Sequence, residues 1–435
     1  MTARGLWGNS FALLATTNLT ALLGYVFWMV CARSFPASTI GQANTVIAAM
    51  TLVAMLTVAG FVPSLTRTLP GASPDELSGI CSTAFVVTTT VSGVAGVIGA
   101  LLLPDHLLDE VGAGWLMGLV GVGAVGTALL LVVNAALLGI RRAELTLFGT
   151  VTGSVLRLVT VFVLIAVGVV AVGADVSAAH AILMLWVASL LVSLGLSMRL
   201  LIRAAPGFRF RPSRTWLSRH GAPVAWDHIA TLAVRSPTFV IPILAAAMFP
   251  AAQVGYMAMT AMISGAFFAV AAAVSGALLA DCADEPQRLR AQARRAMQLI
   301  AALLVVPVAV TCVLASKVLS LFGPDYAAYS SLLILLLLST FPDALINVGI
   351  TVLRVRRRLV LVAAVTVVGA AITIGGSWLL MPSLGIIGAG WSILTSQVIV
   401  AITLMVFGFR RSASSQEPPA MAGQRIAGAL RIGRP

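Results

Sequence analysis

Long apolar runs constrain this chain more than any other feature of its sequence. Twelve can be drawn, each bounded by a short polar or charged segment. A bilayer core about 30 Å thick requires roughly 20 apolar residues in a helix, and it offers no water to an open backbone. The sequence therefore predicts an all-α integral membrane protein. The expected spans are 6–31, 39–65, 77–103, 112–139, 147–173, 178–203, 221–248, 252–280, 296–315, 327–353, 358–381 and 384–408.

The positive charges are concentrated on one side of these spans. Of the 27 Lys and Arg residues, 23 fall on one side when the N-terminus is placed inside, and the outer loops hold only Arg33 and Lys317. Because such residues favour the cytoplasmic side, both termini are expected in the cytoplasm. The bias toward arginine over lysine is typical of a GC-rich bacterial genome, so the expected location is a bacterial plasma (inner) membrane. The net charge of +13 lies in short loops and does not indicate nucleic acid as a partner.

A short phrase occurs twice, at the same point of each half of the chain. Residues 35–41 are FPASTIG and residues 249–255 are FPAAQVG, an offset of 214 positions. With six spans per half, both halves start from the same side, so the repeat is parallel and its pseudo-axis runs along the membrane normal. Two like halves favour a transporter, because substrate sites tend to form where such halves meet. Alternatively, the phrase is a generic helix–helix turn that is used twice.

The loops divide the chain into four expected parts: an N-terminal six-helix lobe (1–203), a cytoplasmic basic linker (204–220), a C-terminal six-helix lobe (221–411) and a disordered cytoplasmic tail (412–435). Aromatic and cationic residues alternate in the linker. One interpretation places this linker on the inner leaflet, with its aromatic side chains buried and its arginines on anionic lipid headgroups. The alternative is a solvated basic linker. The residues concerned are Phe208, Phe210, Trp216, Arg209, Arg211, Arg214 and Arg219.

Charged residues inside spans are costly, face the protein interior and mark functional sites. Arg235 lies deep in the predicted span 221–248. Asp227, Thr231, Arg235 and Thr238 are spaced by four, four and three residues, so they share one helix face. Pro237 and Pro242 follow, and proline disturbs the helical hydrogen bonds. The pattern predicts a polar cavity wall; a structural ion pair between Arg235 and an acid is the alternative.

Asp343 is the second such residue, and it follows Pro342 in the middle of a span. Asn347 lies one turn further on, on the same helix face. A buried carboxylate without a fixed partner can exchange a proton during transport, so Asp343 is a candidate for proton or sodium coupling. A salt bridge from Asp343 to Arg235 or Arg157 is the alternative.

Three weaker candidates complete the set. Arg157 lies about ten residues into the predicted span 147–173, where it lines a cavity or snorkels to the membrane surface. Asp227 lies near the cytoplasmic end of its span and is a second candidate for ion coupling. Asn18 lies among threonines in the first span, where small polar residues serve packing or ligand binding.

Several classes of function are excluded by what the sequence lacks. It has no Walker loop, no HExxH and no GxSxG motif. The connection 66–75 lacks the Gly-x-x-x-Asp-Arg-x-Gly-Arg pattern of the major facilitator family, and the outer loops are too short to hold a polymerase or ligase site. The four cysteines show no metal or redox spacing. We therefore expect a protein that is not an enzyme and that uses no metal and no cofactor.

Two short segments carry a family resemblance. Gly8 to Phe11 opens the first span, and the turn Ala32 to Pro36 leads to Gly41-Gln42-Ala43-Asn44 at the start of the second. With the twelve-span plan, these residues resemble the polysaccharide flippases of the MOP superfamily of multidrug, oligosaccharidyl-lipid and polysaccharide exporters. The resemblance implies two six-helix lobes around a central cleft, and flipping of an oligosaccharide on a polyprenyl pyrophosphate to the outer leaflet by alternating access.

Arginine can bind a pyrophosphate with paired hydrogen bonds, so the resemblance assigns that role to Arg235 and Arg157. The peptidoglycan-precursor flippases of the superfamily have extra spans and a more cationic first helix, which this chain lacks. The alternative function is a cation-coupled exporter of drugs or other small molecules, with Asp227 or Asp343 holding the cation. A scaffold in a polysaccharide assembly complex, with that machinery as its partner, is a weaker alternative.

Overall fold

A computed structural model describes residues 3–58, 60–104, 113–166, 175–213, 232–282, 288–356 and 358–410, with side chains from Leu19 onward in the first helix. The long helices are α1 (Ala3–Ser34), α2 (Ala37–Val58), α4 (Pro74–Leu101), α6 (Ala113–Gly139), α7 (Ala143–Ala166), α8 (Asp175–Ala204), the helix Leu232–Met248, α10 (Ala251–Cys282), α11 (Leu289–Val313), α13 (Ser330–Val355), α14 (Leu359–Leu384) and α15 (Ile387–Arg410). The shorter elements are α3 (Phe61–Thr68), α12 (Ala315–Ser320) and the 3-10 helix η3 (Pro324–Tyr329).

Ten helices in the described part of the chain are long and apolar enough to cross a membrane. The prediction of a helical, multi-pass membrane protein is thereby confirmed. The described apolar parts of the other two, Leu19–Ser34 and Leu232–Met248, fall within or overlap the expected first and seventh spans but are shorter. The full number of twelve spans remains a prediction.

Three local expectations differ from the structure. The expected span 39–65 is two helices, because α2 ends at Val58 and α3 begins at Phe61. The expected span 296–315 begins seven residues earlier, at Leu289, so three arginines lie on the first turns of α11. Pro237 and Pro242 do not interrupt the helix that contains them, which is continuous from Leu232 to Met248.

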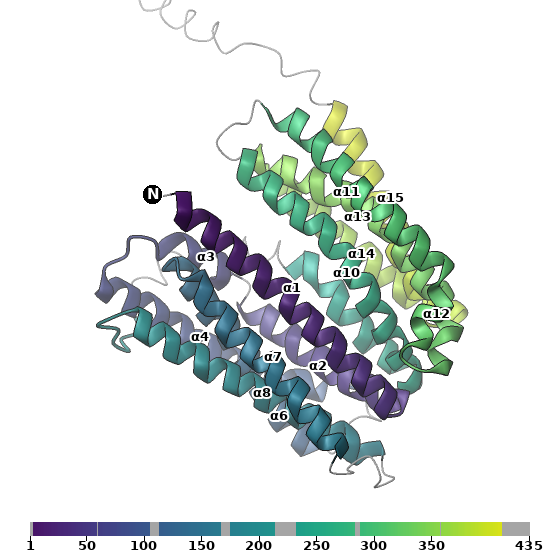
Figure 1. The fold of residues 1–435 in the computed structure, drawn as a ribbon, viewed down its shortest axis with the longest axis horizontal. Helices are drawn as coiled ribbons and strands as arrows, with labels where there is room; N and C mark the ends of the chain where they lie inside the picture. Colours follow the sequence, from purple (N-terminus) through teal and green to yellow (C-terminus); the bar gives the residue numbers. More distant parts are fainter. Residues whose placement is uncertain are drawn as a thin grey trace, which may run out of the picture.

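The described helices form two groups that diverge toward the end of the molecule where the N-terminus lies (Figure 1). We call α1–α8 the N-terminal lobe, the helices from Leu232 onward the C-terminal lobe, and the two ends of the molecule the open end and the closed end. Six helix pairs of the N-terminal lobe recur in the C-terminal lobe. The pairs α2–α4, α2–α6, α4–α6, α6–α7, α6–α8 and α7–α8 correspond to α10–α11, α10–α13, α11–α13, α13–α14, α13–α15 and α14–α15.

Small residues let these helices approach one another closely. Gly96 of α4 faces Gly121 of α6, and a Cβ on Gly96 would lie 2.8 Å from the Gly121 Cα atom. Ser193 of α8 donates a hydrogen bond to the Gly149 carbonyl of α7 at 2.7 Å, and Ser396 of α15 donates one to the Gly369 carbonyl of α14 at 2.9 Å. Such contacts replace the hydrophobic effect, which cannot drive helix association in lipid.

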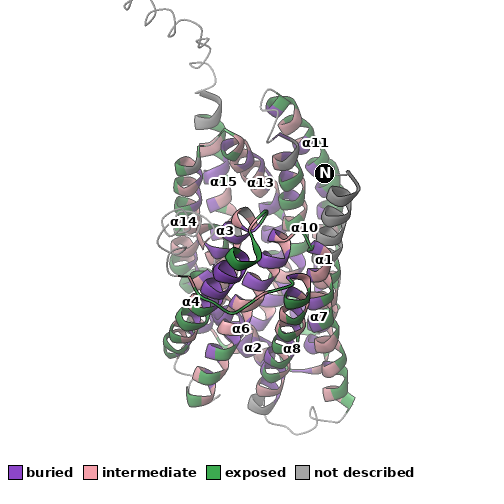
Figure 2. Ribbon diagram, turned by 90° about the vertical axis from the view of Figure 1, so that its left-hand side faces the viewer, coloured by how far each residue is buried: buried purple, intermediate pink, exposed green. Residues whose placement is uncertain are grey.

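Burial follows the same pattern over the whole molecule. Figure 2 shows buried positions where helices face one another and exposed positions on their outward sides. The exposed positions of α4 and α11 include many large apolar residues, such as Val94, Leu101, Val306 and Val310. A membrane would cover this surface.

The glycine contact between α4 and α6 gives a test of the packing. We expect Gly96→Val to lower the free energy of unfolding by about 1–3 kcal/mol, because the new side chain must displace the α6 backbone. Gly118→Val on α6 is the matched control, because a Cβ there meets nothing within 4 Å. Thermal unfolding of both variants in detergent measures the difference, and equal melting temperatures would contradict the close contact.

Candidate functional site

The two lobes meet at the closed end through the repeated sequence phrase. α2 packs against α10, and Gly41 lies directly against Gly255, its counterpart in the second copy. A Cβ on Gly41 would lie 2.9 Å from the Gly255 nitrogen and would overlap the Ala251 carbonyl. A Cβ on Gly255 would lie 3.2 Å from the Gly41 nitrogen and would overlap the Ala37 carbonyl. Backbone touches backbone here, so only glycine fits at either position.

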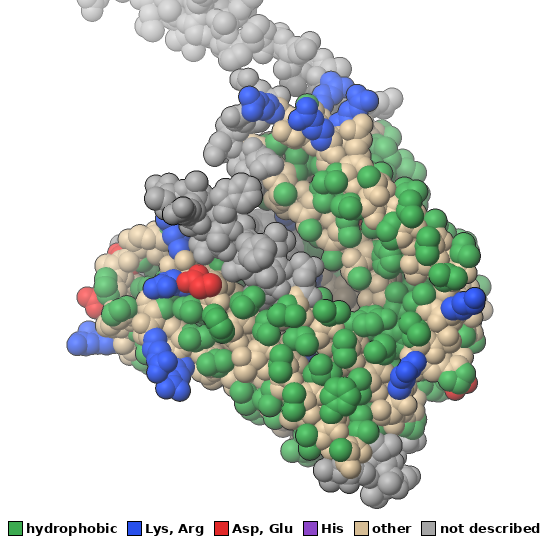
Figure 3. All heavy atoms as spheres, viewed as in Figure 1, with side chains coloured by type: hydrophobic (Ala, Val, Ile, Leu, Met, Phe, Trp, Pro, Cys, Tyr) green, Lys and Arg blue, Asp and Glu red, His purple; other side chains and the backbone are tan. Residues whose placement is uncertain are grey.

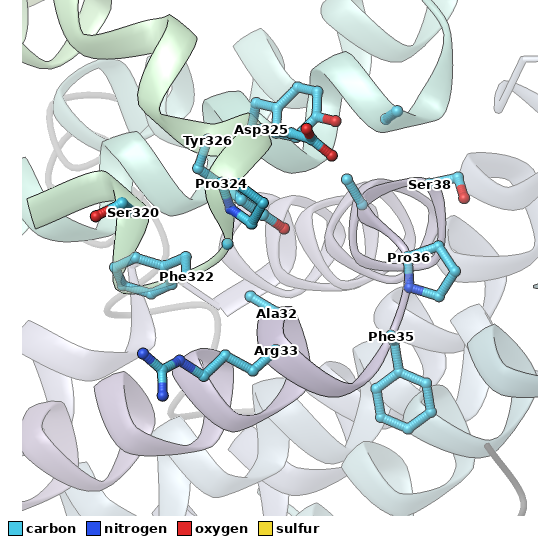
Figure 4. A pocket seen from close by; sticks show the side chains of 14 residues that line it. Ala32, Arg33, Phe35, Pro36, Ser38, Ser320, Phe322, Pro324, Asp325 and Tyr326 are labelled. Atoms are coloured by element: carbon cyan, nitrogen blue, oxygen red, sulfur yellow. The ribbon is translucent and has the colours of Figure 1, made fainter. Parts of the chain in front are cut away.

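Side chains from both lobes add to this junction. Arg33, at the end of α1, donates a hydrogen bond from Nε to the Leu321 carbonyl, with an N–O distance of 2.6 Å. Tyr25 of α1 and Phe322 pack edge to face, with ring centroids 5.6 Å apart. A pocket of about 680 Å³ lies beside these contacts, and Figure 4 shows Arg33 and Asp325 on opposite sides of it. The closed end is thus held by contacts that separation of the lobes would break.

The other end of the junction is open. Figure 3 shows the surface hollowed between the two lobes, with apolar side chains over the flanks and Lys and Arg side chains gathered near the ends. The central cleft that the sequence resemblance implies remains a prediction.

Arg157 lies deeper in the N-terminal lobe than the sequence suggested. α7 begins at Ala143, so Arg157 lies 14 residues, about 21 Å, from the start of the helix. A side chain at that depth does not reach the near membrane surface by snorkelling. Its Nε donates a hydrogen bond to the Ser189 hydroxyl at 3.1 Å, and its guanidinium carbon lies 3.5 Å from the centroid of the Trp186 ring.

This cation has no acidic partner within the described residues. Two rings of the aromatic cluster Phe27–Trp28–Trp186 lie near it, with the Phe27 centroid 6.0 Å from its guanidinium carbon. A guanidinium stacked on an aromatic face is stabilised without neutralisation. Within the described part of the chain, the four N–H donors on the two terminal nitrogens have no protein partner, so the half-buried group retains donors for an anion.

Asp343 is an isolated charge in the C-terminal lobe. It is half-buried in α13, and Asn347 donates from Nδ2 to its Oδ2 atom at 2.9 Å. The alternative salt bridge from Asp343 to Arg235 or Arg157 is not formed among the described residues. The ion pair found there joins Arg142 and Glu144 at 3.2 Å. Within the described residues, neither charge is neutralised by an opposite charge.

The remaining candidates are less well defined. Arg235 and Thr238 are both exposed on the helix Leu232–Met248, as expected for two members of one polar face. Among the described residues, neither forms a hydrogen bond or an ion pair with Arg157 or Asp343. Thr231, Asp227 and the side chain of Asn18 lie outside the described residues. No cluster of three or more metal-binding side chains occurs in the described ranges.

No family model matches the sequence, and no curated protein matches it. Solved structures do match. The chain is similar to an inward-facing multidrug resistance MATE family transporter of the MOP superfamily (TM-score 0.72, 17% identity, 92% of this chain and 96% of that one). It is also similar to the lipid II flippase MurJ in an inward closed conformation (TM-score 0.73, 11% identity, 91% and 86%).

The similarity is weaker to an outward-facing conformation of a multidrug resistance MATE family transporter (TM-score 0.56, 16% identity, 95% and 96%). The chain therefore has the fold of MOP superfamily transporters, as its resemblance to that superfamily predicted. Its opening at one end agrees with the higher TM-score to the inward-facing structure.

The isolated carboxylate on α13 gives a second test. We expect Asp343→Asn to leave the melting temperature unchanged or to raise it, because the amide removes a half-buried charge that no cation of the described residues balances. Asn347→Leu should lower it, because the Asp343 oxygen then loses its donor. Thermal unfolding of the purified full chain checks both, and a large loss of stability in Asp343→Asn would reveal a counter-ion.

Proposed function

We propose that this protein is a membrane transporter that flips a lipid-linked oligosaccharide from the cytoplasmic to the outer leaflet by alternating access. The expected cargo is a polysaccharide precursor on a polyprenyl pyrophosphate. Under the orientation predicted from the arginines, the open end faces the cytoplasm and the closed end faces outward. The structure then corresponds to the state that receives cargo.

The observation that carries this proposal is the isolated guanidinium of Arg157. A pyrophosphate is a dense anion, and arginine binds it with short, paired hydrogen bonds. Ser189 and Trp186 fix the side chain while leaving its terminal nitrogens without protein acceptors. No carboxylate neutralises it within the described residues. Arg235, exposed on the facing lobe, is a second cationic group for the same cargo.

The similarity to a lipid II flippase supports cargo of this class, since that protein's name specifies a lipid-linked substrate. Alternating access requires that the closed end open while the other end closes. The Arg33–Leu321 hydrogen bond and the Gly41–Gly255 contact join the two lobes there. Rocking of the lobes would break both, and the hollow would then face the outer side.

A second candidate function is cation-coupled export of drugs or other small molecules. The observation that favours it is Asp343, a half-buried carboxylate whose side-chain partner within the described residues is the neutral Asn347. Such a group binds a proton, a sodium ion or a cationic molecule. The similarity to multidrug resistance transporters supports it equally.

Flipping in proteoliposomes tests the first proposal. The full chain is reconstituted with a polyprenyl pyrophosphate that carries a fluorescent disaccharide, and dithionite reports which leaflet holds the label. We expect Arg157→Ala to slow flipping about 10-fold or more, because a charge-assisted hydrogen bond contributes about 1.5–3 kcal/mol. Arg157→Lys should recover part of the rate, because it keeps the charge but loses the paired geometry.

Arg199→Ala, which removes an exposed arginine of α8, is the matched control and should flip at the normal rate. Normal flipping by Arg157→Ala would remove Arg157 from the cargo site. A wild-type protein that leaves this probe in place and instead extrudes ethidium against a proton gradient would support the exporter, with Asp343→Asn inactive.

The glycine junction gives a test of the conformational cycle. We expect Gly255→Val to force α2 and α10 apart at the closed end, since its Cβ overlaps the Ala37 carbonyl. Spin labels at Leu102 and Lys317, exposed in opposite lobes at that end, should show a longer distance by double electron–electron resonance. Gly265→Val, also on α10 but with nothing within 4 Å of its Cβ, should leave the distance unchanged.

A further inference from the structure

The chain that leaves the N-terminal lobe is fixed along the side of α4. Residues 208–213, which we call the strap, follow the end of α8 and a turn at Gly207. The backbone N–H groups of Arg209 and Arg211 donate to the hydroxyls of Ser78 and Ser82, each at 3.0 Å. The N–H of Ser213 donates to the Thr83 hydroxyl at 2.7 Å. Three alternate backbone donors thus bind three hydroxyls of one helix.

These bonds satisfy backbone N–H groups that would otherwise lack a partner in a membrane. An extended segment has no internal hydrogen bonds, and near the hydrocarbon it cannot rely on water. The hydroxyls of α4 supply the missing partners. Gly79 lies between them, and a Cβ there would be in contact with the Ser213 side chain at 3.4 Å. The strap therefore lies at van der Waals distance from the helix at this position.

The strap lies on the side of α4 that faces lipid. Three, seven and fourteen residues after Thr83, the same helix face carries Val86, Thr90 and Val97, and all three are exposed. α4 has 28 residues, so it spans about 42 Å, which exceeds the roughly 30 Å of a hydrocarbon core. Its first turns, and the strap on them, therefore lie at the boundary between headgroups and acyl chains.

The outward side of the strap is both cationic and aromatic. Phe210 is 62% exposed, and Arg209 and Arg211 on either side of it are exposed as well. Neither arginine forms an ion pair within the described residues. An aromatic ring flanked by cations is suited to a membrane surface, where the ring enters the boundary and the cations meet phosphates.

We propose that the strap binds anionic phospholipid of the inner leaflet, with Phe210 in the headgroup–acyl boundary and Arg209 and Arg211 on the headgroup phosphates. The hydroxyls of Ser78, Ser82 and Thr83 hold the strap in place, so bound lipid anchors the N-terminal lobe at a fixed depth. This role does not depend on the transported cargo.

Depth measurement tests the placement. A nitroxide at Phe210→Cys, in a chain whose four native cysteines are replaced by alanine, is compared in nanodiscs with labels at Val97 and Asp75, two exposed positions of α4. We expect the label at 210 to be accessible to oxygen and shielded from a nickel chelate, between the two references. Accessibility to nickel equal to that of the label at 75 would overturn the proposal.

Lipid retention tests the partner. Native mass spectrometry counts the phosphatidylglycerol molecules that remain on the full chain. We expect Arg209→Gln with Arg211→Gln to weaken retention about 3-fold or more, and a change to phosphatidylcholine to abolish the difference. The matched control is Arg290→Gln with Arg294→Gln, which removes two exposed arginines of α11. Equal losses of phosphatidylglycerol from both pairs of variants would show a general effect of charge and would overturn the proposal. Full displacement of the lipid by free phosphate would show a site for the soluble ion and would overturn it as well.

Discussion

The direct contact between Gly41 and Gly255 is the interaction on which the arrangement of the two lobes depends. Apolar surface gains nothing by leaving lipid for protein, so helices in a membrane associate through close packing and hydrogen bonds. At this point two backbones touch, and neither tolerates a Cβ. Because the contact lies near one end of α2 and α10, it fixes the closed end and leaves the other end free to diverge. This pair of glycines thereby holds the two lobes together at the closed end.

Much of the fold could be predicted because a bilayer permits so few backbone solutions. The apolar runs predicted most of the ends of the ten confirmed helices to within a few residues. The break between α2 and α3 was missed because Ala59, Gly60 and Phe61 are apolar, so hydropathy does not change where the helix ends. The start of α11 was missed for the opposite reason, since its arginines lie on helical turns that extend beyond the apolar core.

The site was predictable in part. Arg157 and Asp343 were found because a charge inside an apolar run is conspicuous. Asn347 was placed on the helix face of Asp343 by its spacing, and it donates to that carboxylate. The partners of Arg157 were not predicted, because only the packing of α7 on α8 brings Trp186 and Ser189 to it. The repeated phrase was visible as a repeat, but the sequence could not reveal that its two copies contact each other. Arg33 was recognised as an outer-loop cation, and its bond to the Leu321 carbonyl depends on the meeting of the lobes.

The two lobes share their packing and differ in their charges. α14 takes the place of α7 in the packing order and has no charged residue, and α6 takes the place of α13 and has none either. The common architecture therefore requires neither Arg157 nor Asp343, since the equivalent helices pack without them. A half-buried charge that the fold does not need persists only if something offsets its desolvation. The offset for Arg157 comes from Trp186 and Ser189 within the lobe and, in the proposed cycle, from an anionic cargo that arrives through the open end.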